Sequence, residues 1–272
     1  MYKLISCLLF FNIVVGIAGC SAIRPANMNE YEMSEFQSGS ERMPPVTGED
    51  TAVQVQSENE IEVSDYESFL SDDGQHPLTI DSYLQQKCAW QDGYTSLYLE
   101  DETGAYYVYR LICSIEEYEA MQPGRKMRIT GYKSEFSGEP EITDATVSML
   151  DGEYFAKPVD ISDVTEEDLH RHINHAVTFQ NFEIAPMFDG RSAWFYEWDN
   201  SGSAYDESDL YFVAVGPAFS CSSVVNTQLR AADSDTYLAV QRLSVGDRVN
   251  LTGILTWYNG PQLLVTDLAV VS

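Results

Sequence analysis

The sequence predicts an all-β protein built from two tandem five-stranded barrels, each with one short helix. The first observation behind this prediction is a repeat. "GRKMRITGYKSEFSGEPEITDA", residues 124–145, returns as "GDRVNLTGILTWYNGPQLLVTDLA", residues 246–269. The second is that the segments before each copy follow the same order of strand, hairpin and helix. With 272 residues, the chain has room for two domains of ~100 residues each.

The repeated hairpin carries its glycines and threonines at matching places. Four residues recur at one constant offset: Gly124, Thr130, Gly131 and Gly138 return as Gly246, Thr252, Gly253 and Gly260. A further pair, Thr143-Asp144, returns as Thr266-Asp267 after a single insertion. A glycine inside a strand lets a small closed barrel bend sharply without a side-chain conflict. Gly131 therefore predicts a bend in the fourth strand of the first barrel.

The first domain is expected to begin near Pro77. Alternation and turn residues predict a strand at "LTIDSYLQQKCAW" and a hairpin at "YTSLYLEDETGAYYVYRLIC". Ser114 and Glu117 then form a capping box, which opens a short helix at "SIEEYEAM". The repeated hairpin follows and supplies the fourth and fifth strands.

The second domain repeats this plan with longer insertions. Its first strand is predicted at "HAVTFQNFEIAP" and its hairpin at "SDLYFVAVGPAFSCSSVV", with the turn at Gly216-Pro217. A helix at "DSDTYLAVQRL" and the second copy of the repeated hairpin complete it.

Five strands with one helix between the third and the fourth are the order of the OB-fold. The tandem arrangement covers residues 77–272 and follows a leader and an acidic segment, which are described below. This combination resembles uncharacterised OB-fold lipoproteins of bacteria. The resemblance implies a fold and a location. It also implies where a ligand would bind, since OB-folds use the face of strands two and three, flanked by the loops after strands one and four.

The first twenty residues, "MYKLISCLLFFNIVVGIAGC", place one cation before an apolar run. The run is shorter than the ~20 apolar residues of a spanning helix and no cations follow it, so it predicts a secretory signal. It ends in Ile17-Ala18-Gly19-Cys20, which resembles the lipobox of bacterial lipoproteins. That resemblance implies a protein lipid-anchored through Cys20 on the extracytoplasmic face of the cell membrane. A plain secretory signal is the alternative.

Residues 21–76 are rich in acidic residues and carry only Arg24 and Arg42 against them. Such a segment buries too little apolar area to offset ordering, so it predicts a disordered acidic tether, with a binding tail for a basic partner as the alternative. The expected organisation is a signal peptide at 1–19, Cys20 and the tether at 20–76, a first domain at 77–153, a linker at 154–163 and a second domain at 164–272.

The charge disfavours polyanionic partners. Lys and Arg number 15 against 43 Asp and Glu, which gives a formal charge of −28 and repels nucleic acid at long range. Lys126, Arg128 and Lys133 form the one basic patch in the sequence, which is expected to offset the neighbouring residues Glu116, Glu117 and Glu119. Nucleic acid is therefore expected to be an unlikely partner.

In the first domain, candidate ligand-binding residues lie on strands two and three. Alternation places Tyr106 and Arg110 on one side of strand three, opposite the more apolar side with Tyr107, and Tyr98 lies on strand two. An aromatic and guanidinium platform suits a base or a sugar ring. The alternative is that the tyrosines only fill strands, since tyrosine favours strands in any case.

In the second domain, aromatic residues crowd the loop after strand one and the turn between strands four and five. Trp194 and Trp198 lie in the loop, and Trp257 and Tyr258 lie at the turn that an OB-fold brings to the same rim. These four residues are the main ligand-binding candidates. The alternative is that they pack the two barrels together.

Metal and catalytic signals are weak. Asp199, Asp206, Glu207 and Asp209 suit a weak calcium site, but the segment lacks the glycine and the final glutamate of an EF-hand loop. His170, His172 and His175 are better explained by a solvated helix end. The sequence lacks G-x-S-x-G, H-E-x-x-H, Walker and dinucleotide motifs. We expect no cofactor, no metal and no enzymatic activity.

Three cysteines remain once Cys7 leaves with the signal and Cys20 carries lipid. Cys88 and Cys113 fall in one domain and could pair, whereas Cys221 falls in the other. Free buried cysteines are the favoured alternative, because no spacing matches a metal or redox motif.

Three functions compete on this basis. A membrane-anchored binding module for a glycan or a peptide accounts for every feature, so it leads. Binding of single-stranded nucleic acid uses the same stacking face but must overcome the charge. An extracellular hydrolase is the third, and nothing in the sequence points to its acid and base.

Overall fold

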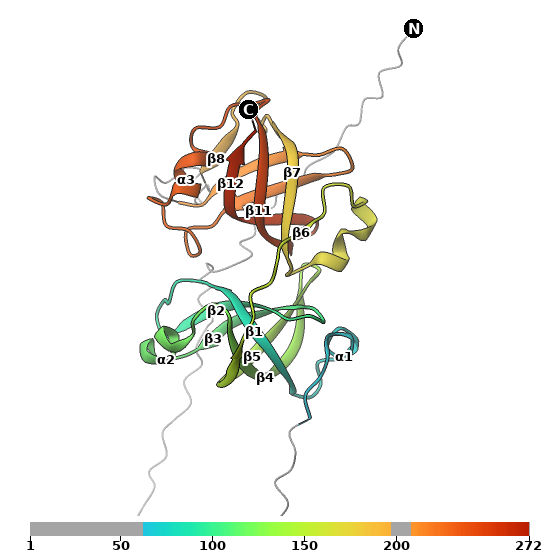
Figure 1. The fold of residues 1–272 in the computed structure, drawn as a ribbon, viewed down its shortest axis with the longest axis vertical. Coiled ribbons are helices and arrows are strands. Elements are labelled where there is room, and N and C mark those ends of the chain that lie inside the picture. Colours follow the sequence, from blue (N-terminus) through green and yellow to red (C-terminus); the bar gives the residue numbers. More distant parts are fainter. Residues whose placement is uncertain (1–61, 197–207, 272) are drawn as a thin grey trace, which may run out of the picture.

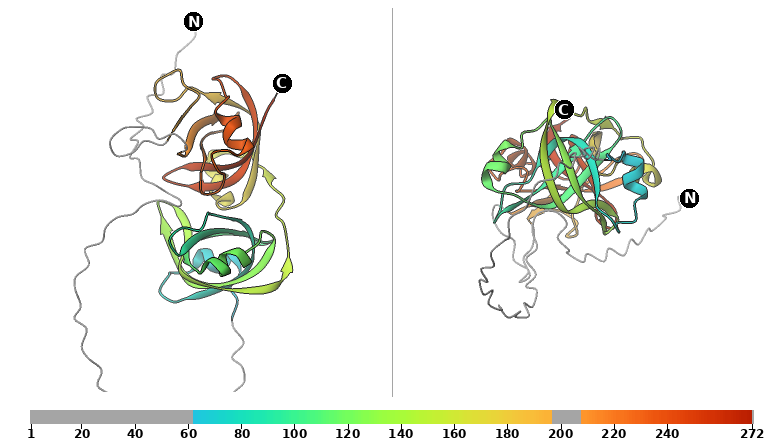
Figure 2. Two further views of the ribbon diagram at one scale, coloured as in Figure 1. Left: turned by 90° about the vertical axis from the view of Figure 1, so that its left-hand side faces the viewer. Right: turned by 90° about the horizontal axis from the view of Figure 1, so that it is seen from below.

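The computed structural model describes residues 62–196 and 208–271, which form two β-barrels stacked one on the other (Figure 1). Figure 2 shows the stack from the side, with the segment that joins the barrels running along one flank. The predicted fold class is confirmed. The predicted signal peptide, Cys20 and most of the acidic tether lie outside the described residues.

The first barrel is closed by five strands in the order β1-β2-β3-β5-β4. Its elements are β1 (Leu78–Lys87), β2 (Tyr94–Glu100), β3 (Ala105–Ile112), α2 (Ile115–Ala120), β4 (Arg125–Phe136) and β5 (Glu139–Glu153). All neighbours are antiparallel except β3 and β5, which pair in parallel at Val108 and Ile142. This is the strand order of an OB-fold.

Local sequence explains two features of this barrel. The predicted capping box at Ser114 and Glu117 is present and starts α2. Gly131 lies where β4 bends, because the register between β4 and β5 shifts between Thr130 and Tyr132. A Cβ added to Gly131 would lie 2.7 Å from the carbonyl oxygen of Thr143, too close for any other residue to fit without movement.

A short helix, α1 (Tyr66–Ser71), lies within the segment that was predicted to be tether. Phe69 is fully buried in the core of the first barrel, and its ring centroid lies 5.2 Å from that of Tyr106. Asp65 caps the helix by accepting a hydrogen bond from the N–H of Ser68 at 2.8 Å. The packed chain therefore begins before Pro77. Tyr66 and Phe69 share one helical face, and the surrounding acidic residues obscured this short apolar pattern.

The second barrel closes in the same way. Its sheet has the order β6-β7-β11-β12-β10-β9-β8, and a pairing of β7 with β9 closes five of these strands into a ring. Its elements are β6 (Val159–Asp160), the 3₁₀ helix η1 (Glu166–His172), β7 (Ala176–Ala185), β8 (Trp194–Tyr196), β9 (Leu210–Val215), β10 (Ser220–Val225), α3 (Asp235–Val240), β11 (Arg248–Trp257) and β12 (Pro261–Val270). Strands β10 and β12 are parallel, as β3 and β5 are in the first barrel.

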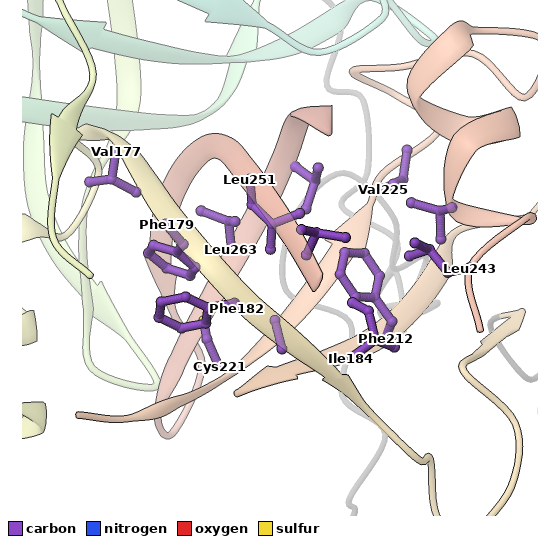
Figure 3. Packing of buried hydrophobic residues seen from close by; sticks show 14 of the residues in the cluster. Val177, Phe179, Phe182, Ile184, Phe212, Cys221, Val225, Leu243, Leu251 and Leu263 are labelled. Atoms are coloured by element: carbon purple, nitrogen blue, oxygen red, sulfur yellow. The ribbon is translucent and has the colours of Figure 1, made fainter. Parts of the chain in front are cut away.

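Two of these strands lie outside the predicted five. β6 falls in the predicted linker and pairs with β7, and the neighbouring Ile161 is buried in the second core. β8 falls in the predicted aromatic loop and pairs with the first half of β9. In the core, the rings of Phe179 and Phe182 stack with centroids 4.8 Å apart (Figure 3).

Three further features can be stated for the described part of the chain. Cys113 and Cys221 are free and buried, so the possible pair of Cys88 with Cys113 is not formed. None of the helices in residues 62–196 and 208–271 has the length and apolar character needed to cross a membrane. Within the same ranges, no group of three or more His, Cys, Asp or Glu is arranged to hold a metal ion.

Candidate ligand-binding surfaces

The outer face of β2 and β3 in the first barrel is largely covered by the second barrel. Tyr98 and Tyr107 stack with ring centroids 4.8 Å apart and are 2% and 3% exposed. They form one cluster with residues from both barrels: Cys88, Val224, Ile254 and Leu264, with Tyr109, Tyr211 and Leu229 at its edge. Tyr98 thus lies on the predicted face, but that part of the face is an interface between barrels.

The prediction for Tyr106 is wrong. Its side chain points into the core of the first barrel, together with Val108 and Leu111, and not outward beside Arg110. Simple alternation fails because β3 has an irregularity at Arg110, whose φ is +49°. The main-chain N–H of Arg110 donates to Ser96 Oγ at 3.1 Å, which holds this bulge. A bulge changes which residues face outward on either side of it.

Polar contacts join the barrels around the buried cluster. The main-chain N–H of Ala89 donates to the carbonyl of Gln228 at 2.8 Å, and Arg230 Nη1 donates to Gln86 Oε1 at 3.2 Å. On the other side, Glu100 accepts from the N–H of Ala176 at 2.8 Å. Its second oxygen lies 3.1 Å from His175 Nδ1. His175 therefore belongs to this interface.

Trp257 and Tyr258 pack against the first barrel. The indole of Trp257 covers Gly138, where an added Cβ would lie 2.6 Å from Trp257 Cδ1. The ring of Tyr258 lies 6.1 Å from that of Phe136, and the next residue, Asn259, donates its N–H to Ser137 at 2.9 Å. The contacts at this turn fit the alternative interpretation, in which Trp257 and Tyr258 pack the two barrels together.

Trp194 lies elsewhere, against α3. Its Nε1 donates to the carbonyl of Gln241 at 3.2 Å, and its ring meets that of Tyr196 edge to face at 5.2 Å. The three described residues of the predicted rim are therefore divided between α3 and the interface. Trp198, and with it Asp199, Asp206 and Glu207 of the possible calcium site, lie outside the described residues. Asp209 accepts hydrogen bonds from Asn226 and Thr227 at 2.7–2.8 Å.

One end of the β2–β3 face remains open. There the Arg110 guanidinium lies 4.2 Å from the ring centroid of Tyr94, and Ile112, paired with Tyr94 across the strands, is 84% exposed. Trp90, in the loop after β1, is partly exposed and donates from Nε1 to the carbonyl of Cys113 at 3.1 Å. We call Trp90, Tyr94, Arg110 and Ile112 the Arg110 platform.

Of this platform, sequence reasoning found only Arg110. Tyr94 and Trp90 were missed, although both belong to the elements that an OB-fold uses for ligands, strand two and the loop after strand one. The loop after strand one of the first domain holds a single aromatic residue, Trp90. The prediction of a ligand site favoured the corresponding loop of the second domain because that loop holds more aromatic residues. The geometry of the turn, in which Gln91 bridges to Tyr94, brings the two rings to the same end of the barrel.

The predicted basic patch is engaged within the first barrel. Arg128 makes two hydrogen bonds to Asp81, at 2.7 and 2.9 Å, and Lys126 Nζ lies 3.9 Å from the same carboxylate. Lys133 Nζ donates to the carbonyl of Asp72, just after α1, at 2.9 Å. These cations thus pair with β1 and the α1 segment, and not with the glutamates of α2 as expected.

The second barrel has a polar groove of about 660 Å³ on its outer surface, at the junction of β6, β7 and the turn after β9. Its charged lining residues are Asp160, Asp163, Glu183 and Arg248, and Pro186 and Pro217 add apolar edges. Arg248 Nη2 already binds Glu183 at 2.9 Å, and Asp160 accepts from the N–H of Ser162 at 3.0 Å. The groove therefore offers carboxylates and amides to a polar ligand, with no free guanidinium.

Comparisons with known proteins find similar folds only. No family model matches the chain, and no curated protein matches it. A murine DNA-binding protein bound to double-stranded DNA shares 12% identity over 71% of this chain and 95% of its own, with a TM-score of 0.34. A replication protein A heterotrimer bound to single-stranded DNA shares 13% over 73% of this chain and 49% of its own, with a TM-score of 0.31.

The tetrameric p202 HIN2 structure shares 11% identity over 73% of this chain and 94% of its own, with a TM-score of 0.30. The strand order of its two barrels makes the chain a tandem OB-fold protein. Two of the similar structures are bound to DNA, which is a property of those proteins. For this chain, the expectation that nucleic acid is an unlikely partner stays a prediction. At sequence identities of 11–13%, the similarity to these structures concerns the fold alone.

Proposed function

We propose that this protein is a non-enzymatic binding module that holds a ring-shaped ligand on the Arg110 platform, with a sugar ring of a glycan as the favoured ligand. The observation that carries this proposal is the stacking of the Arg110 guanidinium on Tyr94 at the open end of the β2–β3 face. Stacked planar groups beside the loop after strand one are how OB-folds hold oligosaccharides and oligonucleotides.

The backbone at Arg110 supports this proposal. A φ of +49° is rare for arginine and costs on the order of 1–3 kcal/mol, so such residues persist where the surroundings enforce them, often at ligand sites. Here the bulge turns the guanidinium onto the ring of Tyr94, which an ordinary strand position would not do. The conformation favours a role for the side chain beyond filling a strand.

A neutral glycan is favoured because the formal charge of −28 repels polyanions. The second candidate is a single-stranded oligonucleotide, and the observation that favours it is the same guanidinium, which can stack on a base and bind a phosphate. The two ligands differ in salt dependence. Affinity for an oligonucleotide falls steeply as salt rises, whereas affinity for a neutral glycan changes little.

The test is an array of glycans and single-stranded oligonucleotides probed with the purified protein, followed by calorimetry at low and high salt. Arg110→Asn is the most informative variant, because asparagine adopts positive φ more readily than arginine yet lacks the guanidinium. We expect affinity to fall about five-fold to a hundred-fold with stability retained, as for the loss of one stacking group worth ~1–3 kcal/mol. Tyr94→Leu should give a similar loss.

The matched control is Arg125→Ala, which removes an exposed cation from the start of β4. Its affinity should equal that of the wild type. If Arg110→Asn and Tyr94→Leu both bind as the wild type does, the platform is not the ligand site. The groove lined by Asp160 and Glu183 is then the next surface to test.

We further propose that the protein is anchored by lipid at Cys20 on the extracytoplasmic face of the cell membrane. The support is the lipobox-like Ile17-Ala18-Gly19-Cys20 at the end of the apolar leader. Cells fed a fatty-acid analogue should label the wild type and Cys7→Ser but not Cys20→Ser. A Cys20→Ser protein that is still labelled and membrane-bound would contradict the proposal.

A further inference from the structure

Two carboxyl groups are buried between the barrels. Glu139 and Glu141 lie at the start of β5, two residues apart and so on one side of the strand, and are 6% and 9% exposed. Gly138, the residue before Glu139, is covered by the indole of Trp257 from the second barrel, and the main-chain N–H of Trp257 lies near enough to lower the pKa of the Glu139 carboxyl. The segment that carries them thus lies against the turn that joins β11 and β12.

Their surroundings provide too few hydrogen-bond donors for two ionised carboxylates. Glu139 Oε1 is buried without a partner, and so is Asn174 Oδ1 from the second barrel. Asn174 Nδ2 donates to the carbonyl of Pro140 at 3.2 Å, so this asparagine lies beside the same stretch of β5. Buried charged oxygens without donors are strongly unfavourable, whereas a protonated carboxyl brings a donor of its own.

The electrostatic environment favours the protonated form. Burial, and then the neighbouring charge of Glu141, raise the pKa of Glu139 to about 8, against the lowering effect of the Trp257 N–H. Burial also raises the pKa of Glu141 to about 7. The other groups that face them are the hydroxyls of Tyr107 on β3 and Tyr98 on β2, which are neutral. Within residues 62–196 and 208–271, no cation contributes to either shift.

We propose that protonated Glu139 and Glu141 form a latch that holds the second barrel over the tyrosine face of the first, and that release of their protons to solvent opens this interface. The interface covers Tyr98, Tyr107 and Tyr109, which continue the β2–β3 face from the Arg110 platform. Closure therefore hides most of one ligand face, and opening extends it. This inference concerns the interface and holds whether or not the Arg110 platform binds a ligand.

The direction of the pH effect follows from the raised pKa values. A carboxyl with a higher pKa in the closed state than in water binds its proton more tightly when the barrels are packed. Its contribution to closure is complete below its ordinary pKa of 4.5 and is lost as pH rises through about 7 for Glu141 and about 8 for Glu139. The interface should be closed in mild acid and open in mild alkali.

Among the described residues, a second titratable pair crosses the interface. His175 Nδ1 lies 3.1 Å from Glu100 Oε1, and this contact is an ion pair only when the histidine is protonated. The test must therefore separate the two glutamates from this pair.

Small-angle scattering from about pH 5 to about pH 9 tests the latch, with the whole protein in each case. We expect the radius of gyration of the wild type to increase reversibly through the range in which the two carboxyls ionise, with far-UV circular dichroism unchanged. The Glu139→Gln/Glu141→Gln variant keeps neutral side chains, so it should stay compact to about pH 9. Glu135→Gln, an exposed residue of the same hairpin, is the matched control and should open as the wild type does.

Three results would overturn the proposal. The first is a wild-type radius of gyration that stays constant across the range, and the second is opening of the double variant over the same pH range as the wild type. The third is closure that depends on added calcium and is lost in EDTA at constant pH, since a cation and not a proton would then hold the carboxylates. If the double variant does not fold, His175→Gln removes the other titratable group of the interface. Opening of this variant over the same pH range as the wild type supports the latch, and loss of the opening overturns it.

Discussion

The two barrels share a strand order and a bending glycine but differ in the outer face of strands two and three. In the first barrel the covered part of this face carries Tyr98 and Tyr107, and the open end carries Arg110 on Tyr94. In the second barrel the pair of Tyr211 and Val224 reaches the interface, and the open end carries small aliphatic and serine residues. A repeated fold thus provides two equivalent faces, and local residues decide which can hold a ligand.

The largest expected effect concerns α1, which precedes β1 and buries Phe69, whereas the 3₁₀ helix η1 precedes β7 in the second barrel and buries Leu169. Phe69→Ala removes a fully buried ring that packs on Tyr106, so it should lower the free energy of unfolding by about 3–5 kcal/mol. Urea unfolding followed by circular dichroism measures this.

Leu70→Ala is the matched control, since Leu70 is 44% exposed on the same helix and should change stability by no more than ~0.5 kcal/mol. Equal effects of the two substitutions would mean that α1 does not belong to the first core. The comparison of α1 with η1, each of which places one side chain in the core of its barrel, would then fail.

The next effect tests what the barrels have in common. Gly131→Ala and Gly253→Ala each place a Cβ against the main chain of the facing strand, at Thr143 and at Leu264. We expect each to destabilise the protein by about 1–3 kcal/mol, because the backbone of a closed barrel yields little. Thermal melts of both variants, with Ser134→Ala as a nearly neutral control, measure it. A loss at only one glycine would show that the two bends are not equivalent.

Much of the fold was predictable because its signals are local. The constant offset of Gly124, Thr130, Gly131 and Gly138 marked the last hairpin of each barrel, and the capping box at Ser114 marked α2. The helix α1 was missed because its two packed rings, buried Phe69 and half-buried Tyr66, stand in an acidic segment whose average composition predicts disorder. Short β6 and β8 were missed because edge strands of two or three residues carry no detectable alternation.

The candidate site was harder to predict because it depends on contacts far apart in sequence. Strand alternation predicted an outward Tyr106, but one bulge at Arg110 reversed the assignment. Tyr98 and Trp257 do lie on outer surfaces, and only the packing of one barrel on the other shows that these surfaces are covered. No local pattern in the sequence predicts how one barrel packs on the other, so the covered surfaces could not be predicted.

The smallest expected effects come from the two neighbouring tyrosines that this bulge assigns to opposite sides of β3. Tyr106 lies in the core with its hydroxyl beside the Thr103 side chain, so Tyr106→Phe should cost about 1 kcal/mol of unfolding free energy. The Tyr107 hydroxyl is buried at the interface with no hydrogen bond of good geometry, so Tyr107→Phe should change the unfolding free energy by less than ~0.5 kcal/mol, or raise it. Urea unfolding of both variants at about pH 5, where the latch is closed, gives the comparison. A larger loss for Tyr107→Phe than for Tyr106→Phe would return Tyr106 to the outer face, as alternation alone predicts, and would remove the tyrosine face from the interface.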